Sequence, residues 1–342
     1  MLPRSRYDTL RDSVMLLLAL RFIRGGNDMQ WHLRPATEAD LPRIAALISE
    51  RNREPVTAEE LKRQEEQIQP DDKFLRAMLQ AEDGQVVGYC MGFGSKYNKP
   101  GHFRMNVRVD EPYWNQGAGS VMYRYVEDWA GGQGATHLSA VASERHPHSR
   151  PWAERRGFVL DQHIFESTLD LRTFDPAPFA DSLQVARDAG IRFTTLAALG
   201  DDEATFRRYF DWMWEVSLDI PGREGDPKPP FDLFAKAVTG DPRWSKERVF
   251  LAMDGDRFAG SAELALQKDG SMYHAGTGID RAYRGRRLSH AIKLVAIQYA
   301  MAQGVPYLRT NNNSKNAPIL AVNRAFGYKP EPGFFEMVKH LA

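Results

Sequence analysis

Two stretches of the sequence decide the fold: VDEPYWNQGAG at residues 109–119 and GIDRAYRGRRLS at residues 278–289. Each begins at the end of a predicted strand, passes through a turn rich in glycine or arginine, and enters a predicted helix. Such a turn directs unpaired backbone N–H groups and the positive end of the helix dipole toward one point. The pattern is typical of a site for a pyrophosphate group.

The two stretches belong to an internal repeat. Gly88 and Gly260 lie 172 positions apart, each shortly after an acidic-glycine hairpin turn, Asp83-Gly84 or Asp254-Gly255. Gly117 and Arg287 lie 170 positions apart, and so do Gly157 and Gly327. These three pairs of landmarks occur in the same order along the chain and at nearly the same offset, which predicts two copies of one domain.

Each copy predicts the order strand, helices, hairpin, long strand, turn, helix, strand, helix, strand. In the first copy we expect strands over residues 31–35, 74–80, 86–94 and 102–109, and helices over 37–47, 57–67 and 118–130. In the second we expect strands over 192–196, 249–253, 258–266 and 272–279, and helices over 201–216 and 288–302. Hairpin-linked strands before the turn argue against a Rossmann-type nucleotide enzyme.

Domain boundaries follow from this order. We expect an extension at 1–28, a first domain at 29–170, a linker at 171–188 with Pro176 and Pro178, and a second domain at 189–342. The apolar run from Met15 to Ile23 is interrupted by arginine and is too short to span a bilayer. Residues 1–28 are therefore interpreted as an appended helix, or as the result of a misplaced start before Met29.

Composition narrows the class of protein. The 342 residues are 42% hydrophobic and 26% charged, which predicts globular domains with packed cores. Lys+Arg and Asp+Glu both number 45, so no overall field favours nucleic acid or an anionic membrane. The single cysteine, Cys90, lies in an apolar stretch and excludes an intrachain disulfide and a cysteine-rich metal site. We expect a structural thiol there and no metal.

The two turns resemble the coenzyme A pyrophosphate motif of the GNAT (GCN5-related N-acetyltransferase) family, Arg/Gln-x-x-Gly-x-Gly/Ala. The resemblance extends over nearly all of the chain after Met29 and includes tandem members similar to mycothiol synthase. It implies an α/β (α+β) fold of two tandem acyl-CoA N-acyltransferase domains. Each would have a mixed, mostly antiparallel sheet, splayed at its fourth strand, with flanking helices. Both copies depart from the motif: Trp114 replaces its first Arg or Gln, and Arg287 and Ser289 replace its small residues.

The resemblance implies acetyl-CoA, or another acyl-CoA, as co-substrate. In the second copy its expected contacts are Thr277, Gly278, Ile279, Arg284, Gly285, Arg286, Arg287, Leu288, Ser289, Asn311 and Asn316. In the first copy they are Val109, Gln116, Gly117, Ala118 and Gly119.

Catalytic positions favour the second copy. The family often places a Tyr acid four residues before a Gly-Phe/Tyr pair, with an Asn upstream; the first copy has Ala153 and His146 there, and the second has Asn323 and Asn316. The first domain is therefore predicted to be degenerate. Asparagine cannot act as an acid, so water or Tyr328 would protonate the leaving thiolate. Asn323 remains a candidate catalytic residue, whereas Asn312 and Asn313 are interpreted as loop or helix-cap residues.

Glu263 and His274 are the candidate catalytic bases, and they lie on neighbouring strands that are expected to face the cleft. Alternatively, Glu263 lies on a solvent-exposed face of its strand, and His274 is a packed strand residue without a catalytic role.

Candidate acceptor contacts are Trp214, Glu215 and Asp219. Trp212 and Trp214 cannot both face the core of one helix, so one of them is available to the pocket or to the interface between halves. A capping or surface role suits Glu215 and Asp219 equally well.

These features predict a cytoplasmic N-acetyltransferase, monomeric or homodimeric, acting on a small-molecule or peptide amine by direct attack. No nucleic acid or membrane partner is expected. The alternative is a non-catalytic acyl-CoA-binding or regulatory protein, because neither copy has the Tyr acid or an unbroken motif.

Overall fold

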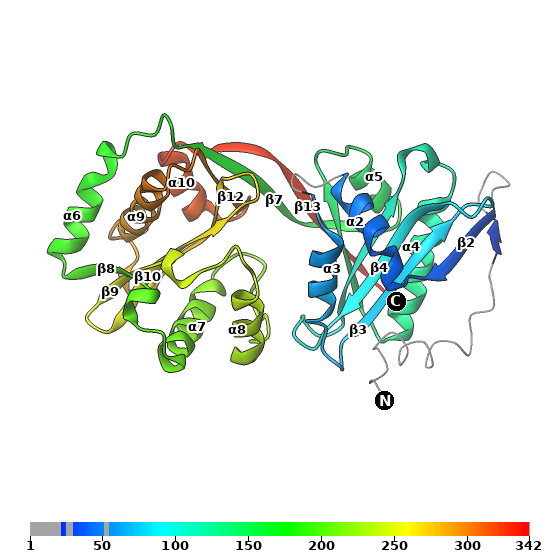
Figure 1. Cartoon of the computed structure of the whole chain (residues 1–342), viewed down its shortest axis with the longest axis horizontal. Coiled ribbons are helices and arrows are strands. Elements are labelled where there is room, and N and C mark those ends of the chain that lie inside the picture. Colours follow the sequence, from blue (N-terminus) through cyan, green and yellow to red (C-terminus); the bar gives the residue numbers. More distant parts are fainter. Residues whose placement is uncertain (1–21, 25–29, 51–54, 342) are drawn as a thin grey trace. The chain divides into compact units, whose positions relative to one another are not determined.

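A computed structural model describes residues 22–24, 30–50 and 55–341 of the chain (Figure 1). The chain divides into two compact units. Unit 1 comprises residues 1–141, 155–159 and 337–342, and unit 2 comprises residues 142–154 and 160–336. The apolar run from Met15 to Ile23 lies outside the described residues except for Phe22 and Ile23.

Unit 1 is built on mostly antiparallel strands with helices on both faces. Its strands are β1 (Phe22–Arg24), β2 (Gln30–Pro35), β3 (Lys73–Gln80), β4 (Val86–Gly94), β5 (His102–Val109) and most of β6 (His137–Ser143), in that spatial order. Its helices are α2 (Leu41–Ser49), α3 (Ala58–Glu65) and α4 (Ala118–Gly132), with 3-10 turns η1 (Glu38–Asp40) and η2 (Glu111–Tyr113). Thr57 begins α3 as an N-cap that accepts a hydrogen bond from the Glu60 amide.

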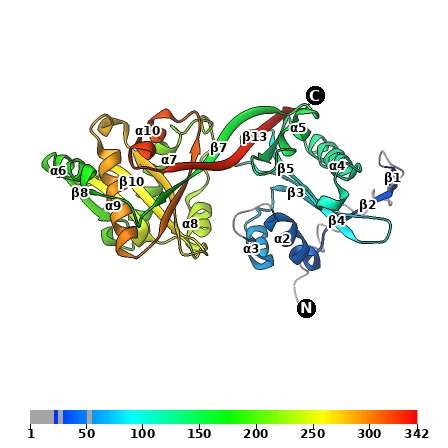
Figure 2. The same ribbon diagram turned by 90° about the horizontal axis from the view of Figure 1, so that it is seen from above.

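The alternation of side chains along β4 explains how both faces of this sheet are covered. Tyr89 packs with α2 in one apolar cluster, while a Cβ at Gly92 would collide with Trp129 of α4 on the other face. Figure 2 shows α2 and α3 on one side of β3 and β4 and α4 on the other. Cys90 is fully buried, and this burial raises the pKa of its thiol to about 12.

Unit 2 repeats this plan. Its strands run in the order β13 (Lys329–His340), β7 (Val159–Asp170), β12 (Tyr307–Asn313), β11 (Met272–Ile279), β10 (Arg257–Leu266), β9 (Val249–Asp254) and β8 (Ile191–Thr195). Its helices are α5 (Ser149–Glu154), α6 (Ala180–Asp188), α7 (Glu203–Ser217), α8 (Phe231–Thr239), α9 (Leu288–Ala302) and α10 (Ala317–Ala325). Short 3-10 turns are η3 (Ala177–Phe179), η4 (Ala197–Leu199), η5 (Lys246–Arg248) and η6 (Arg281–Tyr283).

Helices cover both faces of the β8–β12 sheet. One apolar cluster joins α9 and α6 to Leu264 and Met272, and another joins α7 and α8 to Leu251 and Phe258. Figure 1 shows α9 and α7 on opposite sides of β9 and β10. Side chains that alternate along β10 therefore point toward α9 or toward α7.

Both sheets splay where parallel pairing begins. β5 pairs with β6 only from His102 to Arg104, and β11 pairs with β12 only at Met272 and Tyr273. Beyond these residues each strand end is separated from its neighbour. The predicted splay at the fourth strand of each domain is confirmed, since β2–β5 and β8–β11 are the successive antiparallel strands before it.

The last strands of the two repeats are exchanged. β7 follows the first repeat in the sequence but pairs with β12 of the second, Leu169 lying opposite Leu308. β13 follows the second repeat but lies next to β6 in the strand order, and its end from Met337 onward belongs to unit 1. The contact-based units therefore differ from the boundaries expected from sequence.

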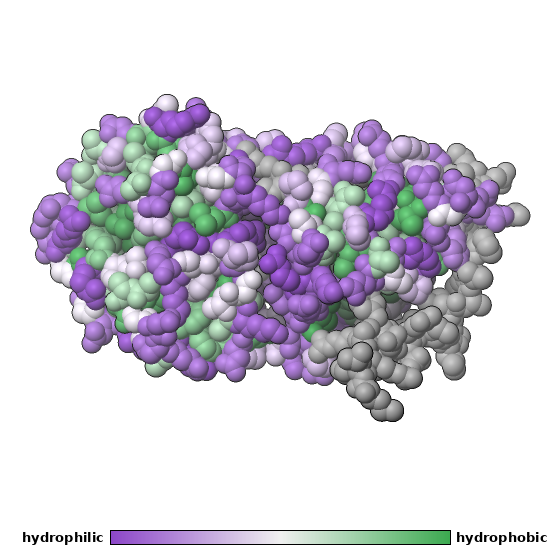
Figure 3. Space-filling view, in the orientation of Figure 1, coloured by the Kyte–Doolittle hydropathy of each residue, from purple (hydrophilic) through white to green (hydrophobic). Residues whose placement is uncertain are grey.

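Two further segments differ from expectation. Residues 180–188, within the expected linker, form α6, whose Leu183 and Ala186 are buried in the same cluster as α9. Phe22–Arg24, within the extension expected to be helical, is a strand that pairs antiparallel with β2. Among the described residues no helix has the length and apolar character needed to cross a membrane, and hydrophilic residues are spread over the face seen in Figure 3.

Gly333 on β13 lies where a side chain has no room. A Cβ there would lie 2.1 Å from the Ile164 carbonyl oxygen of β7, and the Gly333 amide donates to Glu144 at 2.6 Å. We expect Gly333→Ala to lower the free energy of unfolding by about 1–3 kcal/mol, measured by urea denaturation. Gly131→Ala in α4, where a Cβ meets nothing within 4 Å, is the matched control and should be neutral or slightly stabilising. Equal stability of the two variants would contradict the packing argument.

Candidate active site

The loop before α9 has the backbone of an anion site. The Asp280 side chain accepts a hydrogen bond from the Ala282 amide at 2.8 Å and so holds η6, and Gly285 and Arg287 have φ of 75° and 59°. In the loop before α4, Asn115 and Gly117 have φ of 58° and 90°. Asn115 and Arg287 are the only non-glycine residues with positive φ in the described part of the chain. The two loops share one conformation, and each keeps one residue in a strained region.

A hydrogen bond to the preceding strand also recurs. The Trp114 indole donates to the Val109 carbonyl at 2.8 Å, and the Arg284 Nε donates to the Ile279 carbonyl at 3.1 Å. Trp114 therefore preserves the structural contact made by the equivalent arginine. It does not supply a positive charge, so only the second loop offers a cation at this position.

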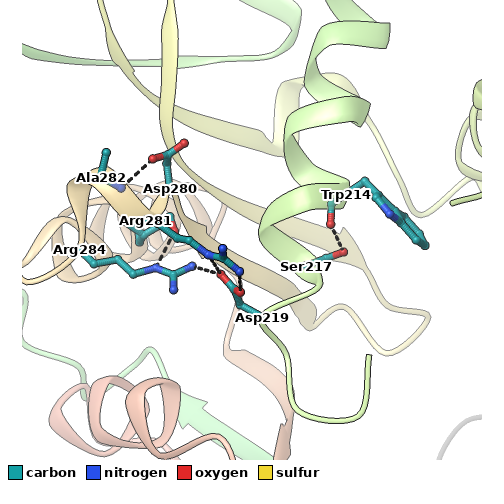
Figure 4. Close-up of polar contacts among 8 residues, drawn as sticks. Trp214, Ser217, Asp219, Asp280, Arg281, Ala282 and Arg284 are labelled. Carbon is teal, nitrogen blue, oxygen red and sulfur yellow. Dashed lines mark hydrogen bonds and ion pairs between the residues drawn. The ribbon is translucent and has the colours of Figure 1, made fainter. Parts of the chain in front are cut away.

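Asp219 connects the end of α7 to this loop (Figure 4). Its carboxylate accepts hydrogen bonds from Arg281, whose Nε lies 3.1 Å away, and from Arg284. The Arg281 and Arg284 hydrogen bonds hold the pKa of Asp219 at about 2. The structure thus places Asp219, expected at the acceptor, against the arginines of the candidate phosphate loop.

The residues after Asp219 contact the far side of the splay. The Pro221 carbonyl accepts a hydrogen bond from Asn313 of β12 at 3.1 Å, and Asn313 also donates to Gln162 of β7. A Cβ at Gly222 would collide with the Gln162 side chain, so the segment lies close to β7. Residues 219–222, which we call the strap, therefore link the candidate phosphate loop after β11 to strands β12 and β7.

A β-bulge lies beside the splay. Glu263 of β10 pairs with Gly276, whereas Leu264 pairs with His274, so Ala275 has no partner on β10. In unit 1 the equivalent pairs, Met91 with Asn106 and Gly92 with Met105, are continuous. A bulge leaves a residue unpaired and redirects the side chains around it. Because a Cβ at Gly276 would meet nothing within 4 Å, a ligand can approach the backbone here.

Glu263 lies on the α7 face of this bulge. It accepts a hydrogen bond from the hydroxyl of Tyr209, which is buried in α7. Burial raises the pKa of Glu263, although the Tyr209 hydrogen bond acts in the opposite direction. At the equivalent position in unit 1 the cross-strand register places Met91, which cannot take a proton.

His274 faces α9, on the opposite side of the sheet from Glu263. Its Nδ1 lies 3.4 Å from Lys293 Nζ, and its Nε2 lies 2.9 Å from Thr277 Oγ1. Burial, followed by the charge of Lys293, lowers the pKa of His274 well below its usual value. The two candidate bases were expected to face one cleft together; the alternation of paired positions at the bulge separates them instead.

The asparagines divide into three environments. Asn316 is the N-cap of α10 and accepts from the Ile319 amide, while Asn311 is exposed on β12. Asn312 and Asn313 are buried strand residues and not the loop or helix-cap residues expected. Asn323 is buried and donates to Asn312 at 2.6 Å, which itself donates to Ser167 at 2.8 Å. The Oδ1 atom of Asn323 is buried without a hydrogen-bond partner.

The remaining acceptor candidates lie on α7. Trp214 is buried, and the Arg223 guanidinium lies 4.9 Å from its ring centroid. Glu215 is exposed. Three relevant residues were not predicted from sequence: Tyr209, Arg281 and Lys293. Lys293 carried a usable signal, because it is the single charge in the apolar run Ala291-Ile292-Lys293-Leu294-Val295-Ala296-Ile297.

Comparison with known proteins gives a family match in the first repeat. Residues 41–158 match the model of the acetyltransferase (GNAT) family. The matched residues make up about a third of the chain and end before the second repeat begins. The matched family is one of acetyltransferases. Among the described residues no cluster of histidine, cysteine and carboxylate side chains suits a metal ion.

Solved structures show the same tandem GNAT fold over most of the chain. A GCN5-related N-acetyltransferase from Sphaerobacter thermophilus has a TM-score of 0.67 at 19% identity and covers 91% of this chain and 95% of its own. A tandem GNAT protein from the clavulanic acid biosynthesis pathway has a TM-score of 0.68 at 17% identity, with coverage of 91% and 98%. A GCN5-related N-acetyltransferase from Kribbella flavida has a TM-score of 0.54 at 13% identity, with coverage of 92% and 71%. No curated protein matches the chain.

Arg287→Gly tests the strain in the second loop. Glycine adopts positive φ without the steric cost of a side chain, so we expect the free energy of unfolding to rise by about 1 kcal/mol. Affinity for acetyl-CoA should fall, because the Arg287 cation is lost. Asn115→Gly in the first GNAT domain is the matched control: it should stabilise similarly and leave affinity unchanged. Chemical denaturation and isothermal titration measure both effects, and an unchanged affinity for Arg287→Gly would exclude its side chain from binding.

Asp219→Asn tests the ion pairs at the same loop. Removal of this carboxylate leaves Arg281 and Arg284 free for an anion. We therefore expect acetyl-CoA to bind roughly fivefold more tightly, a gain of about 1 kcal/mol in binding free energy. The pKa of about 2 means that wild-type affinity should not vary through titration of Asp219 above about pH 4. Glu215→Gln, a neighbouring exposed carboxylate, should change affinity little. A weaker affinity for Asp219→Asn would show that the strap supports the site instead of competing for its arginines.

Proposed function

We propose that the second domain is the catalytic one and transfers an acetyl group, or a related acyl group, from acyl-CoA to an amine by direct attack. The observation that carries this proposal is the asymmetry at the splay. Unit 2 has Glu263 beside a bulge at Ala275, whereas unit 1 has Met91 and unbroken pairing. The acceptor belongs to the class of small-molecule or peptide amines.

The loop before α9 would hold the pyrophosphate of the co-substrate. Backbone N–H groups at the start of a 15-residue helix, together with Arg284, provide donors and positive charge. Nothing lies within 4 Å of a Cβ at Gly285, so an anion can approach this backbone. The arm of the co-substrate would then enter the splay between β11 and β12.

Glu263 is proposed to remove the proton from the attacking amine, directly or through water. Tyr209 orients the carboxylate, and the raised pKa of Glu263 makes it a stronger base than an exposed glutamate. Unpaired backbone N–H groups at the bulge would stabilise negative charge developing on the carbonyl oxygen. The activity should therefore rise as pH increases through the raised pKa of Glu263.

The first domain is proposed to be degenerate. Its loop keeps Gly117 and Gly119, but the Trp31 indole donates to the Gln116 carbonyl at 3.3 Å and the Gln116 side chain donates to Pro112 at 2.7 Å. The Gln116 side chain is thus already engaged within its own loop. A structural or ligand-binding role suits this domain.

A non-catalytic acyl-CoA-binding protein is the second candidate. Asn323 at the position of the family acid favours it, because an amide cannot donate a proton to a leaving thiolate. Both candidate functions predict that the protein binds acyl-CoA, but only the catalytic one predicts turnover.

Matched variants of the two loops distinguish the domains. Ser289→Glu and Gly119→Glu place a negative charge at the same position of each loop, where it would repel a pyrophosphate. We expect Ser289→Glu to abolish acetyl-CoA binding in isothermal titration and Gly119→Glu to leave it unchanged. The reverse result would assign binding to the first domain.

Glu263→Gln tests the chemistry. Coenzyme A release with a panel of amines should fall by about 100-fold or more, while acetyl-CoA affinity is retained. Tyr209→Phe should cause a smaller loss, since it removes only the orienting hydrogen bond. Binding without coenzyme A release by the wild-type protein, for every amine tested, would establish the non-catalytic alternative.

A further inference from the structure

A buried polar cluster lies on the α9 side of the splay, opposite Glu263. Lys293 Nζ lies 3.4 Å from His274 Nδ1, and His274 Nε2 lies 2.9 Å from Thr277 Oγ1. The Tyr328 hydroxyl lies 3.5 Å from the same Nδ1. Lys293 and His274 are each 1% exposed, whereas Thr277 is partly exposed. The contacts thus form a line from a buried amine to a hydroxyl on the splayed part of β11.

No carboxylate neutralises this lysine in the described part of the chain. The groups that face Lys293 are His274 of β11 and Tyr328 before β13, whose ring centroid lies 4.6 Å from Nζ. The charge of Lys293 also acts on His290 of α9, which the charge of Arg287 at the start of that helix reaches as well. Burial lowers the pKa of Lys293 to about 7. A buried amine with no carboxylate partner costs stability, so its presence calls for a role beyond packing.

The first repeat lacks the whole cluster. Cross-strand pairing places Met105 at the position of His274, and the 170-residue offset places Val107, Tyr123 and Phe158 at the positions of Thr277, Lys293 and Tyr328. The cluster therefore occurs only in the domain that also has Glu263 and the bulge. Its position on the other face of the sheet suits the second proton transfer of the reaction, because the attacking amine and the leaving thiolate occupy different positions around the reacting carbon.

We propose that Thr277 gives the proton to the departing thiolate and that His274 and Lys293 resupply Thr277 from behind. This inference rests on the proposed acyl transfer by the second domain, and it replaces the acid that Asn323 cannot provide. Thr277 is the catalytic residue of the relay, and His274 and Lys293 are positioning residues that act through it.

Acyl transfer by this route moves one proton from the amine and one to the sulfur. The amine nitrogen forms a bond to the acyl carbon and loses a proton to Glu263, and the carbon–sulfur bond breaks with its electron pair on sulfur. The Thr277 hydroxyl gives its proton to that sulfur, His274 passes the Nε2 proton to Thr277, and the Lys293 ammonium passes a proton to His274 Nδ1. The products are the amide and the free thiol, and Lys293 is left as an amine that regains a proton from water.

The relay predicts a bell-shaped dependence of kcat on pH. Glu263 must be deprotonated, so the rate rises through its pKa, and Lys293 must be protonated, so the rate falls as pH increases through a value near 7. Glu263→Gln should remove the acid limb, and Lys293→Met should remove the alkaline limb. Lys293→Arg keeps the charge but cannot give up its proton, so it should also lose the alkaline limb.

The deciding experiment compares Thr277→Val with Thr277→Ser in the full-length protein, with acetyl-CoA and an amine that the wild type accepts. Serine retains the hydroxyl and valine retains the shape. We expect Thr277→Ser to keep kcat within about threefold and Thr277→Val to lower it by about 100-fold, with KM for acetyl-CoA unchanged in both. Equal kcat values for the two variants, or an alkaline limb that persists in Lys293→Met, would overturn the relay.

The outcomes separate this inference from the proposed function. Turnover by the wild type that depends on Glu263 but not on the Thr277 hydroxyl would overturn the relay alone. Absence of turnover with every amine in the panel would overturn both.

Discussion

The parallel pairing of β11 with β12 ends after two residue pairs, and the candidate site depends on that early divergence. Backbone groups of β11 beyond Tyr273 have no partner strand on that side, so the ladder cannot satisfy them. The bulge at Ala275 removes pairing with β10 at the same place. A ligand with its own hydrogen-bonding groups can therefore replace a strand here, and His274 and Thr277 lie within a few residues of this gap.

The bulge also separates the two groups that are proposed to transfer protons. Residues paired across β10 and β11 share a face of the sheet, so Glu263 points with Gly276 toward α7 and His274 points with Leu264 toward α9. Tyr209 supports the first group, and Lys293 lies behind the second. If the proposed base and the proposed proton relay lay on the same face of the sheet, they could exchange protons with each other. They lie on opposite faces, so the sheet separates them.

The loop before α9 has the same backbone conformation as the loop before α4, although its residues differ. Arg287 adopts the left-handed conformation that Gly117 adopts in the first loop, at a steric cost of about 1–2 kcal/mol. Trp114 and Arg284 make the same contact to the preceding strand with different chemistry. The second loop combines this backbone with positive charge, and Asp219 neutralises part of that charge when no anion is bound.

Local sequence patterns predicted most of the elements. The ranges expected for β4, β5, β11 and α9 agree with the structure at every boundary, because alternation, turn glycines and helix stops are local signals. The two loops and the unequal repeats also followed from sequence, since motif and spacing are read directly from the chain. The placement of Glu263 and His274 on opposite faces did not, because the bulge that separates them depends on the register with β10.

What the sequence by itself determined is therefore the repeat, the two loops and the residue types available in each copy. Only the tertiary structure decided which of those residues meet. β7 and β13 could each close either repeat, because similar repeats present similar sheet edges, and long-range pairing selects the exchanged arrangement. Asp219 lies 62 positions from Arg281 and Lys293 lies 19 from His274, so no local signal shows that either pair is in contact.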